Sequence, residues 1–571
     1  MGLRATFTKR VWERRRLAGV SYSFRTPDSP ARRRRSWARC AARFLAVLAL
    51  AASWLASTLP SAAAIAPPTG LVSRTGDQSI VLHWDRHSAK NLLGYRAYKA
   101  RTASGTFVPV QAGLLTSSSL CDLNVTNEQS WFYRVTALTA SGESAPSPSL
   151  CATAHPFQND DEFLDYLQRT GFDFFWYEAN PLNGLIPDRT SKDSPCSIAA
   201  VGFGLTAIAI GIEHGWITRA EGVRRVTKTL ETFLRKPQGI SASKNIGYRG
   251  WFYHFLDMKT ALRFTRFNTE LSSIDTALLL AGMLYAKEYF NGTGQEENSI
   301  RVIVDSIINR VDWQWMANGR DILSMGWLPD TDFLSSKWIG YNEAMLLYCL
   351  GLGVATNPLP ASAWAGWTSG YRWATNCEMP FLSFAPLFGH QYSHCWIDFR
   401  NIADDFMREK GITYFENSRR ATLAQRAYCM AKPKFQLAGP GVLWGLTASD
   451  GPTGYLAHGA PPPENDDGTI APTAVAGSIP FTPEFSVPTL RGLYERYRPK
   501  IWTAYGFRDA FNLGLNWWGP DVLGIDVGPV VIMIENYRSQ GVWKTFMRNE
   551  IVRRGLQRAG FLPVQSAQSK S

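Results

Sequence analysis

The chain has 571 residues, too many for one ordinary domain, and 45% of them are hydrophobic, enough to bury a substantial core. Its formal net charge of +13 comes from residues 1–64, where 13 Lys and Arg stand against two acidic residues. In the rest of the chain 47 basic residues face 45 acidic ones, which excludes the basic surface that nucleic-acid binding requires.

A basic segment and an apolar run open the chain. Arginines at 32–35 precede FLAVLALAASWLASTL, and small residues follow at Ala62-Ala63-Ala64. This order is typical of a secretory signal peptide and predicts that residues 1–64 are removed, with the mature protein beginning near Ile65. A retained membrane anchor is the alternative, and the shortness of the run argues against it. We therefore expect a periplasmic or extracellular protein without stable membrane insertion.

Short alternating strands separated by turn residues occupy residues 65–155, as an all-β sandwich requires. Pro67-Pro68, Trp84, Tyr95 in GYRAY, the YRVTA strand and the closing SGESAPS resemble a fibronectin type III domain. The resemblance implies an independently folding module that takes no part in catalysis. Cys121 and Cys151 could form a disulfide in it. No paired CxxC spacing occurs, so no zinc site is expected.

Residues 156–562 show two kinds of helical pattern. One kind is nearly uncharged, as at 197–212, 274–285, 344–353 and 530–534; the other is amphipathic, as in TRAEGVRRVTKTLETFLRK. Burying the first kind behind the second gives an inner and an outer ring of helices. About a dozen segments predict an (α/α)6 toroid whose inner helix starts line a cavity. A disordered tail is expected at 563–571.

Four carboxylates precede or begin apolar or Ala-rich helices: Glu270, Glu343, Glu416 and Asp526. Motifs for dinucleotide, NTP, serine-hydrolase and zincin chemistry are missing from the sequence. Carboxylates among aromatic residues suit carbohydrate, because sugar rings stack on aromatic faces and glycoside hydrolysis uses two carboxyl groups. We therefore predict one site assembled from several loops, without metal or cofactor.

Each carboxylate also has a structural alternative. Glu343 is expected as the first residue of its helix, where the dipole favours the anion, whereas burial against Trp338 and Tyr341 would favour the acid. Glu416 could instead pair with the arginines at 419–420, and Asp526 has the same ambiguity as Glu343. The SSID spacing makes Asp275 more suited to helix capping than to catalysis.

Aromatic, histidine and charged residues near these helix starts are the candidates for binding substrate. His390 and His394, four residues apart, could alternatively hold a metal, but a third ligand in a known pattern is missing from the sequence nearby. The substrate-binding candidates are Trp251, Tyr253, His254, Asp257, Trp338, Tyr341, His390, His394, Asp398, Arg400 and Arg419.

Several long motifs appear in order between residues 161 and 560. They are SIAAVGFGLTA, GWFYHFLDMKT, ELSSIDTALLLAG, GYNEAMLLY, PLFGHQYSHCWIDFR, YFENSRRATLAQRAY and DDGTIAPTAVAGSIPF. Together they resemble the glycoamylase-like domain, and within it the endo-β-1,2-glucanases of glycoside hydrolase family 144. The resemblance implies an (α/α)6 barrel, no cofactor, and cleavage of β-1,2-glucan with inversion. Glu343 in GYNEA matches the family's general acid; the base is not placed.

Two other functions remain open from the sequence. One is a transglycosylase of the cyclic β-1,2-glucan type, which would release rings in place of short linear sugars. The other is a glucan-binding protein of the cell envelope that binds without creating reducing ends.

Overall fold

The computed structural model describes residues 65–436, 441–460 and 465–564. The predicted signal peptide and almost all of the predicted tail lie outside these ranges. Within the described ranges, none of the helices combines the length and apolar character that crossing a membrane needs.

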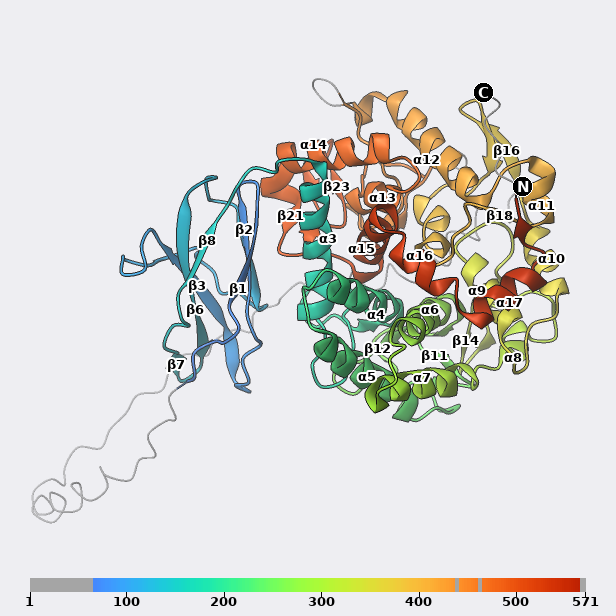
Figure 1. Ribbon diagram of the computed structural model, residues 1–571, viewed down its shortest axis with the longest axis horizontal. Coiled ribbons are helices and arrows are strands. Elements are labelled where there is room, and N and C mark those ends of the chain that lie inside the picture. The colour runs from blue at the N-terminus through green and yellow to red at the C-terminus, as the bar shows by residue number, and fades with distance from the viewer. Residues whose placement is uncertain (1–64, 437–440, 461–464, 565–571) are drawn as a thin grey trace, which may run out of the picture.

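Eight antiparallel strands make two sheets at the N-terminal side (Figure 1). Ile80, Leu82 and Trp84 alternate along one strand and its end, so their side chains face the same side and are buried in one cluster with Tyr95 and Tyr133. The Trp84 and Tyr95 rings meet edge to face at 5.3 Å. The all-β prediction is confirmed, whereas Cys121 and Cys151 are free thiols, so the predicted disulfide is wrong. One sheet has the order β1 (Val72–Gly76), β2 (Ser79–His83), β5 (Ser119–Asp122); the other has β4 (Val108–Pro109), β3 (Leu92–Ala100), β6 (Ser130–Thr139), β7 (Gly142–Glu143), with β8 (Leu150–Thr153) also on β6.

The β segment is joined to the helical part by a buried polar contact. Ser79 Oγ lies 2.9 Å from the Tyr166 hydroxyl and 2.8 Å from that of Tyr494. His83 Nε2 lies 3.2 Å from Asp173 Oδ2, and both side chains are fully buried. Desolvated polar groups of this kind are costly when one partner is removed. That the β segment folds independently stays a prediction.

Helices dominate the remainder of the chain. The uncharged segments become helices buried on all sides, and the amphipathic ones cover them, as their patterns predict. The helices are α3 (Asp160–Tyr177), α4 (Ile198–Glu213), α5 (Arg219–Arg235), α6 (Ser273–Tyr289), α7 (Gln295–Ile308), α8 (Trp313–Ala317), α9 (Met345–Gly353), α10 (Ser362–Thr368), α11 (Asp405–Lys410), α12 (Tyr414–Met430), α13 (Pro472–Gly477), α14 (Pro483–Ile501), α15 (Gly524–Arg538), α16 (Gly541–Phe546) and α17 (Glu550–Arg558), with 3-10 turns η2 (Leu387–His390), η3 (Ser393–Cys395) and η4 (Pro433–Phe435).

Helix α4 is central among the buried helices and packs against α6 and α15. Glycines allow the α4–α6 approach: a Cβ on Gly202 would lie 2.2 Å from the Leu278 carbonyl oxygen, and one on Gly282 would lie 2.0 Å from the Gly202 oxygen. The two backbones therefore touch directly, which fixes how the loops before each helix are placed.

The helix that follows Glu416 is a covering helix. Helix α12 has a partly exposed side, while residues 387–395, expected as a polar binding stretch, are fully buried as η2 and η3. These turns contact α13 and α15, so the buried layer at this point is a short 3-10 element. Its irregular turns hide it from a search for 3.6-residue periodicity.

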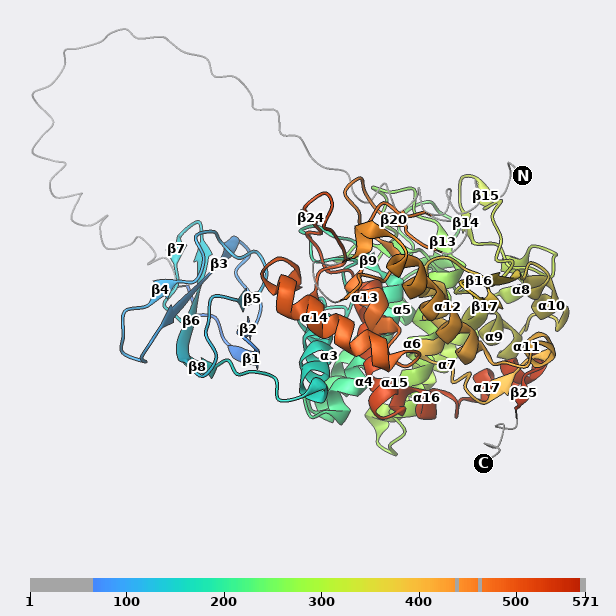
Figure 2. The ribbon, with the colours of Figure 1, turned by 90° about the horizontal axis from the view of Figure 1, so that it is seen from above.

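The buried helices all point the same way. The C-terminal ends of α4 and α15 meet where His214 Nε2 lies 2.8 Å from Glu535 Oε2, and Arg554 of α17 holds the last carbonyl of α9. At the other end, which we call the loop face, lie the starts of α4, α6, α9 and α15. Figure 2 shows β13, β14, β15, β20 and β24 toward one edge and α16, α17 and β25 toward the other.

Short strands pair in small antiparallel sheets within the loops of the helical part. They pair as β9 (Cys196–Ser197) with β12 (Phe255–Leu256); β13 (Leu271–Ser272) with β14 (Gly326–Leu328) and β15 (Asp332–Phe333); β10 (Gly247–Tyr248) with β11 (Trp251–Phe252); β16 (Trp373–Asn376) with β17 (Met379–Leu382); β18 (Ile402–Ala403) with β25 (Leu562–Pro563); β19 (Ala448–Ser449) with β20 (Leu456–Ala457); β21 (Trp502–Thr503) with β22 (Gly506–Phe507); and β23 (Phe511–Asn512) with β24 (Trp517–Trp518).

Candidate active site

Three of the four predicted catalytic carboxylates lie at the loop face. Glu270 directly precedes β13, Glu343 lies two residues before α9, and Asp526 is in the first turn of α15. Glu416 lies instead in the first turn of the covering helix α12 and pairs with Arg420 at 2.8 Å, the structural alternative.

Glu270 belongs to a group with His254 and Asp275. His254 Nδ1 lies 3.2 Å from Glu270 Oε1, and His254 Nε2 lies 3.5 Å from Asp275 Oδ1. Ser272 caps α6 by accepting from the Asp275 amide, and its hydroxyl donates to Asp275 Oδ2, so the predicted capping is present. The imidazole of His254 therefore lies between two carboxyl groups, within 3.5 Å of each.

Glu343 lies in a turn that leads into α9. The helix begins at Met345, so the expectation that Glu343 is its first residue is wrong. Asn342 Oδ1 accepts from the Ala344 amide at 3.0 Å, and the Glu343 carbonyl accepts from Ser393 Oγ at 3.1 Å. These bonds fix the backbone on both sides of a partly exposed side chain, which suits a residue that must reach substrate.

Trp338 and Tyr341 flank Glu343 in the chain and are buried. Trp338 Nε1 donates to Ser273 Oγ at 2.8 Å, and the Tyr341 ring lies 6.0 Å from that of Tyr414 in a parallel arrangement. Burial raises the pKa of Tyr341 to about 12. Both rings therefore form a wall that supports the Glu343 turn.

Asp526 shares a hydrogen bond with a second buried carboxyl group, that of Asp509. Two carboxyl groups can hydrogen-bond only if one of them carries a proton. Burial, and then the negative charges of Asp526 and Asp450, raise the pKa of Asp509 well above its ordinary value. The other oxygen of Asp509 accepts from the Asp450 amide at 2.6 Å, which fixes its orientation.

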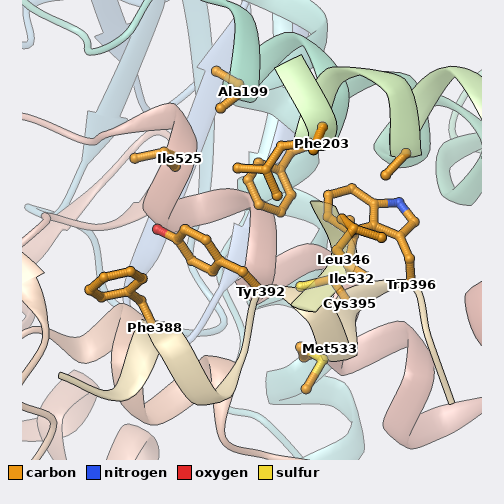
Figure 3. Close-up of a cluster of buried hydrophobic side chains, with 14 of the residues drawn as sticks. Ala199, Phe203, Leu346, Phe388, Tyr392, Cys395, Trp396, Ile525, Ile532 and Met533 are labelled. Atoms are coloured by element: carbon orange, nitrogen blue, oxygen red, sulfur yellow. The ribbon is translucent and has the colours of Figure 1, made fainter. Parts of the chain in front are cut away.

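Tyr392 connects this carboxyl pair to the buried core. Its hydroxyl donates to Asp526 Oδ1 at 3.4 Å, and Figure 3 shows its ring between Phe203 and Phe388 with the hydroxyl directed toward Ile525. The neighbouring Ser393 bonds the Glu343 carbonyl, so η2 and η3 tie the starts of α9 and α15 together.

A single arginine lies among the next group of acids. Arg189 nitrogens lie 3.2 Å from Asp188, 2.9 Å from Asp450 and 3.8 Å from Asp521. Burial disfavours its charge, but the three aspartates raise its pKa above the ordinary value. Burial also raises the pKa of Asp450 although Arg189 lowers it, because one cation serves three anions.

Sequence reasoning did not identify Asp188, Arg189, Asp509 and Asp521 as site residues. Asp188 and Arg189 share one loop, and Asp509 and Asp521 lie in two others. These loops contain only isolated β bridges or two-residue strands. The adjacent Asp188-Arg189 pair gave the one local signal, and only the fold brings Asp450 to it.

Three predicted binding residues do not converge on the loop face. Arg400 pairs with Asp398 at 2.7 Å and also bonds Gln540, which follows the C-terminal end of α15, so this pair lies at the opposite end. Arg419 pairs with Glu484 on the exposed surface between α12 and α14.

Four more predicted binding residues are core residues. Trp251 and Tyr253 have no exposed surface, and Trp251 Nε1 donates to the Asp312 carbonyl at 2.9 Å. Burial lowers the pKa of His390 to about 4 and that of His394 to about 3, so both are neutral at neutral pH. In this fold none of the four has a face that a sugar could stack on.

The remaining alternatives have structural answers. Asp257 accepts hydrogen bonds from the Thr260 amide and hydroxyl at 2.8 and 2.9 Å and thereby closes a turn. Among the described residues, no group of three His, Cys, Asp or Glu side chains is placed to hold a metal ion, which includes His390 and His394.

The loop face thus combines His254 between two carboxyl groups, the buried pair Asp509 and Asp526, and the partly exposed side chain of Glu343. Acid chemistry needs a proton donor beside the leaving group, and base chemistry needs a carboxylate that activates water. This arrangement has candidates for both on loops held by buried helices.

Comparison with known proteins identifies relatives of the whole described chain. Residues 335–550 match the family model described as putative glucoamylase. An exo-β-1,2-glucooligosaccharide sophorohydrolase (non-reducing end) of Parabacteroides distasonis is 31% identical over 537 residues, covering 88% of this chain and 72% of that protein.

Solved structures give the same picture. A β-1,2-glucanase from Parabacteroides distasonis matches with a TM-score of 0.78 and 29% identity, covering 88% of this chain and 74% of that one. An endo-β-1,2-glucanase from Chitinophaga pinensis, in complex with sophorotriose and glucose, matches with a TM-score of 0.65 and 28% identity, covering 71% of this chain and 99% of that one.

Proposed function

Because this chain belongs to the glycoamylase-like family of glycoside hydrolases, we propose that it hydrolyses β-1,2-glucan or its oligosaccharides at the loop face. The observation that carries the proposal is the set of acids at the starts of α6, α9 and α15, in a chain similar along most of its length to two proteins named for this substrate.

In the proposed mechanism Glu343 is the general acid. Its side chain is partly exposed on a turn fixed by Asn342 and Ser393, so it can approach a leaving oxygen without losing its orientation. We assign Asp526 as the base because it lies in the first turn of α15 at the loop face, where its Oδ1 accepts from the Tyr392 hydroxyl. With a water between base and sugar, the outcome is inversion.

Glu270 positions substrate in this scheme. Its Oε1 lies 3.2 Å from His254 Nδ1, so His254 orients the carboxyl group that we expect to accept hydrogen bonds from sugar hydroxyls. We assign His254, Glu270 and Arg189 with its aspartates to binding of the sugar hydroxyls.

Whether the enzyme attacks chain ends or internal bonds is inferred from how much of this chain matches an exo-acting and an endo-acting enzyme. The helical part, residues 156–562, is about 71% of the chain, which equals the share matched by the endo-acting enzyme, whereas the exo-acting relative matches 88%. The additional match requires the β segment. We therefore propose sophorose release from chain ends and treat internal cleavage as the alternative.

Two structural proposals accompany this function. The orders β1-β2-β5 and β4-β3-β6-β7 support a fibronectin type III-like sandwich for residues 65–155. Six buried elements (α4, α6, α9, η2–η3, α13 and α15), alternating in the chain with covering helices, support an (α/α)6 toroid for residues 156–562. The signal-like segment 1–64 supports export to the periplasm or outside.

Incubation with β-1,2-glucan and with β-1,3-, β-1,4- and β-1,6-glucans tests the function. We expect products only from β-1,2-glucan, with sophorose as the sole early product; a ladder of lengths would indicate endo cleavage. Rings would favour the transglycosylase, and binding without new reducing ends would favour the non-catalytic protein. The Glu343→Gln variant is the control for contaminating activity.

A further inference from the structure

A second pocket lies behind the strand that supports Glu270. It has a volume of about 340 Å³ and is lined by residues that follow α8 and by the stretch after β14. Two cations, Arg320 and Lys337, line it together with Ser335 and Asn318, and no acidic residue is in the lining. Its size falls in the range of small-ligand pockets.

Neither cation of this pocket forms an ion pair within the described residues. Among the described residues, neither Arg320 nor Lys337 has a carboxylate within 4 Å, in contrast to Arg249 and Arg219, which pair at 2.8 and 2.6 Å. The carboxylate of the adjacent Asp321 is already bound by the Ser362 hydroxyl at 2.9 Å. Two unbalanced cations in one concave site attract an anion.

The rest of the lining suits a sugar. Phe333, Leu334 and Ile322 give an apolar wall, and Ser335 and Asn318 offer a hydroxyl and an amide. Sugar rings present an apolar face and a polar rim, which this combination matches. A bare inorganic anion would leave the apolar wall without a partner.

The pocket is close to the catalytic loops. A Cβ on Gly326 of β14 would lie 3.1 Å from Glu270 Cγ and 3.3 Å from Leu334 Cδ1, so one backbone position separates the two sites. Lys337 directly precedes Trp338, whose indole bonds Ser273 at the start of α6.

We infer that this pocket binds a sugar carrying a phosphate, sulfate or carboxylate group, with Arg320 and Lys337 on the anion and Phe333 and Leu334 against the ring. The inference adds a site to the proposed function: substituted glucans would be held beside the mouth by their anionic groups. The proposed hydrolysis of unsubstituted glucan does not need it.

Calorimetric titration with glucose 6-phosphate, inorganic phosphate and glucose tests this site. We expect glucose 6-phosphate to bind at least tenfold more tightly than either other probe, and the Arg320→Gln/Lys337→Gln variant to weaken it at least tenfold. The matched control, Arg224→Gln/Lys228→Gln on α5, removes two exposed cations elsewhere and should bind as the wild type does.

Three outcomes would overturn the inference: no binding of glucose 6-phosphate, equal loss in the control variant, or inorganic phosphate binding as tightly as the sugar phosphate. Hydrolysis of neutral β-1,2-glucan is measured on the same proteins and should be equal in all of them. If the wild type itself does not hydrolyse neutral β-1,2-glucan, the proposed function is refuted, while the binding result is unaffected.

Discussion

The two ends of the buried helices treat charge in opposite ways. At the loop face, Arg189 serves three aspartates, and burial and the charges of Asp526 and Asp450 raise the pKa of Asp509. At the opposite end, Glu535 contacts His214 and Ser539 and accepts from Gln168, and Asp398 is held by Arg400. The difference separates chemistry from scaffold: acids with too few cations mark the site, whereas acids with matched partners stabilise the fold.

The largest expected effect is at Glu343. Glu343→Gln keeps the shape and removes the proton, so turnover on β-1,2-glucan should fall by roughly two to four orders of magnitude. Steady-state kinetics with a natural glucan and with an activated leaving group measure it. The activated substrate should recover much of the loss, because its leaving group needs little protonation. Full activity on the natural glucan would show that the acid lies elsewhere.

Arg189 tests whether the loop face depends on one cation. Arg189→Gln removes the cation that Asp188, Asp450 and Asp521 share, which should cost about 3–5 kcal/mol of the free energy of unfolding. Chemical denaturation measures it. The matched control is Arg249→Gln, which breaks a more exposed pair with Asp312 and should cost under about 1 kcal/mol. Equal losses in both variants would contradict the comparison.

Asp509 and Glu535 should give opposite pH dependences. A raised pKa means that folded Asp509 keeps a proton that the unfolded chain loses, so stability falls as pH rises above its ordinary value of 3.8. Asp509→Asn keeps both hydrogen bonds and should remove this decline, making the variant more stable than the wild type at neutral pH. Unfolding followed from pH 4 to 8 measures it.

For Glu535 the sign reverses. Burial opposes its ionisation, but the hydrogen bond with His214 lowers its pKa, so its contribution is present above the ordinary value of 4.5 and is lost as pH falls. Glu535→Gln should therefore lower stability by roughly 1–3 kcal/mol at neutral pH and leave turnover unchanged. Parallel slopes for the Asp509 and Glu535 variants would refute the contrast between the two ends.

The smallest expected effect is at Asp398. Its pair with Arg400 is partly exposed, so Asp398→Asn should change stability by less than about 1 kcal/mol and leave kcat and KM as they are. A fall in kcat/KM of tenfold or more would show that this pair reaches substrate, as its sequence context predicts.

The sequence predicts the buried helices well because a helix that is apolar on all sides has to be buried on all sides. It also predicts the capping at Ser272, because a hydroxyl three residues before an acid at a helix start is the spacing of a capping pair. It fails at η2 and η3, whose fully buried histidines read as polar ligands. It also fails at Trp251, since an aromatic side chain gives no sequence signal for which of its faces is covered.

The acids around Arg189 are beyond local reasoning. Asp188, Asp450 and Asp521 are separated by 71 residues or more, and nothing in any one loop reveals that the three share a cation. Glu343, Glu270 and Asp526 were accessible because each accompanies a helix start that the pattern marks.

The contact between Ser79 and Tyr494 sets a limit on the order of events during synthesis. These residues are 415 positions apart, so the hydroxyl pair cannot form until all but the last 77 residues exist. The β segment is the first described part to be made and has to wait for α14 before it docks. Closing so long a span is slow, so the β segment stays undocked while most of the helical part is being made.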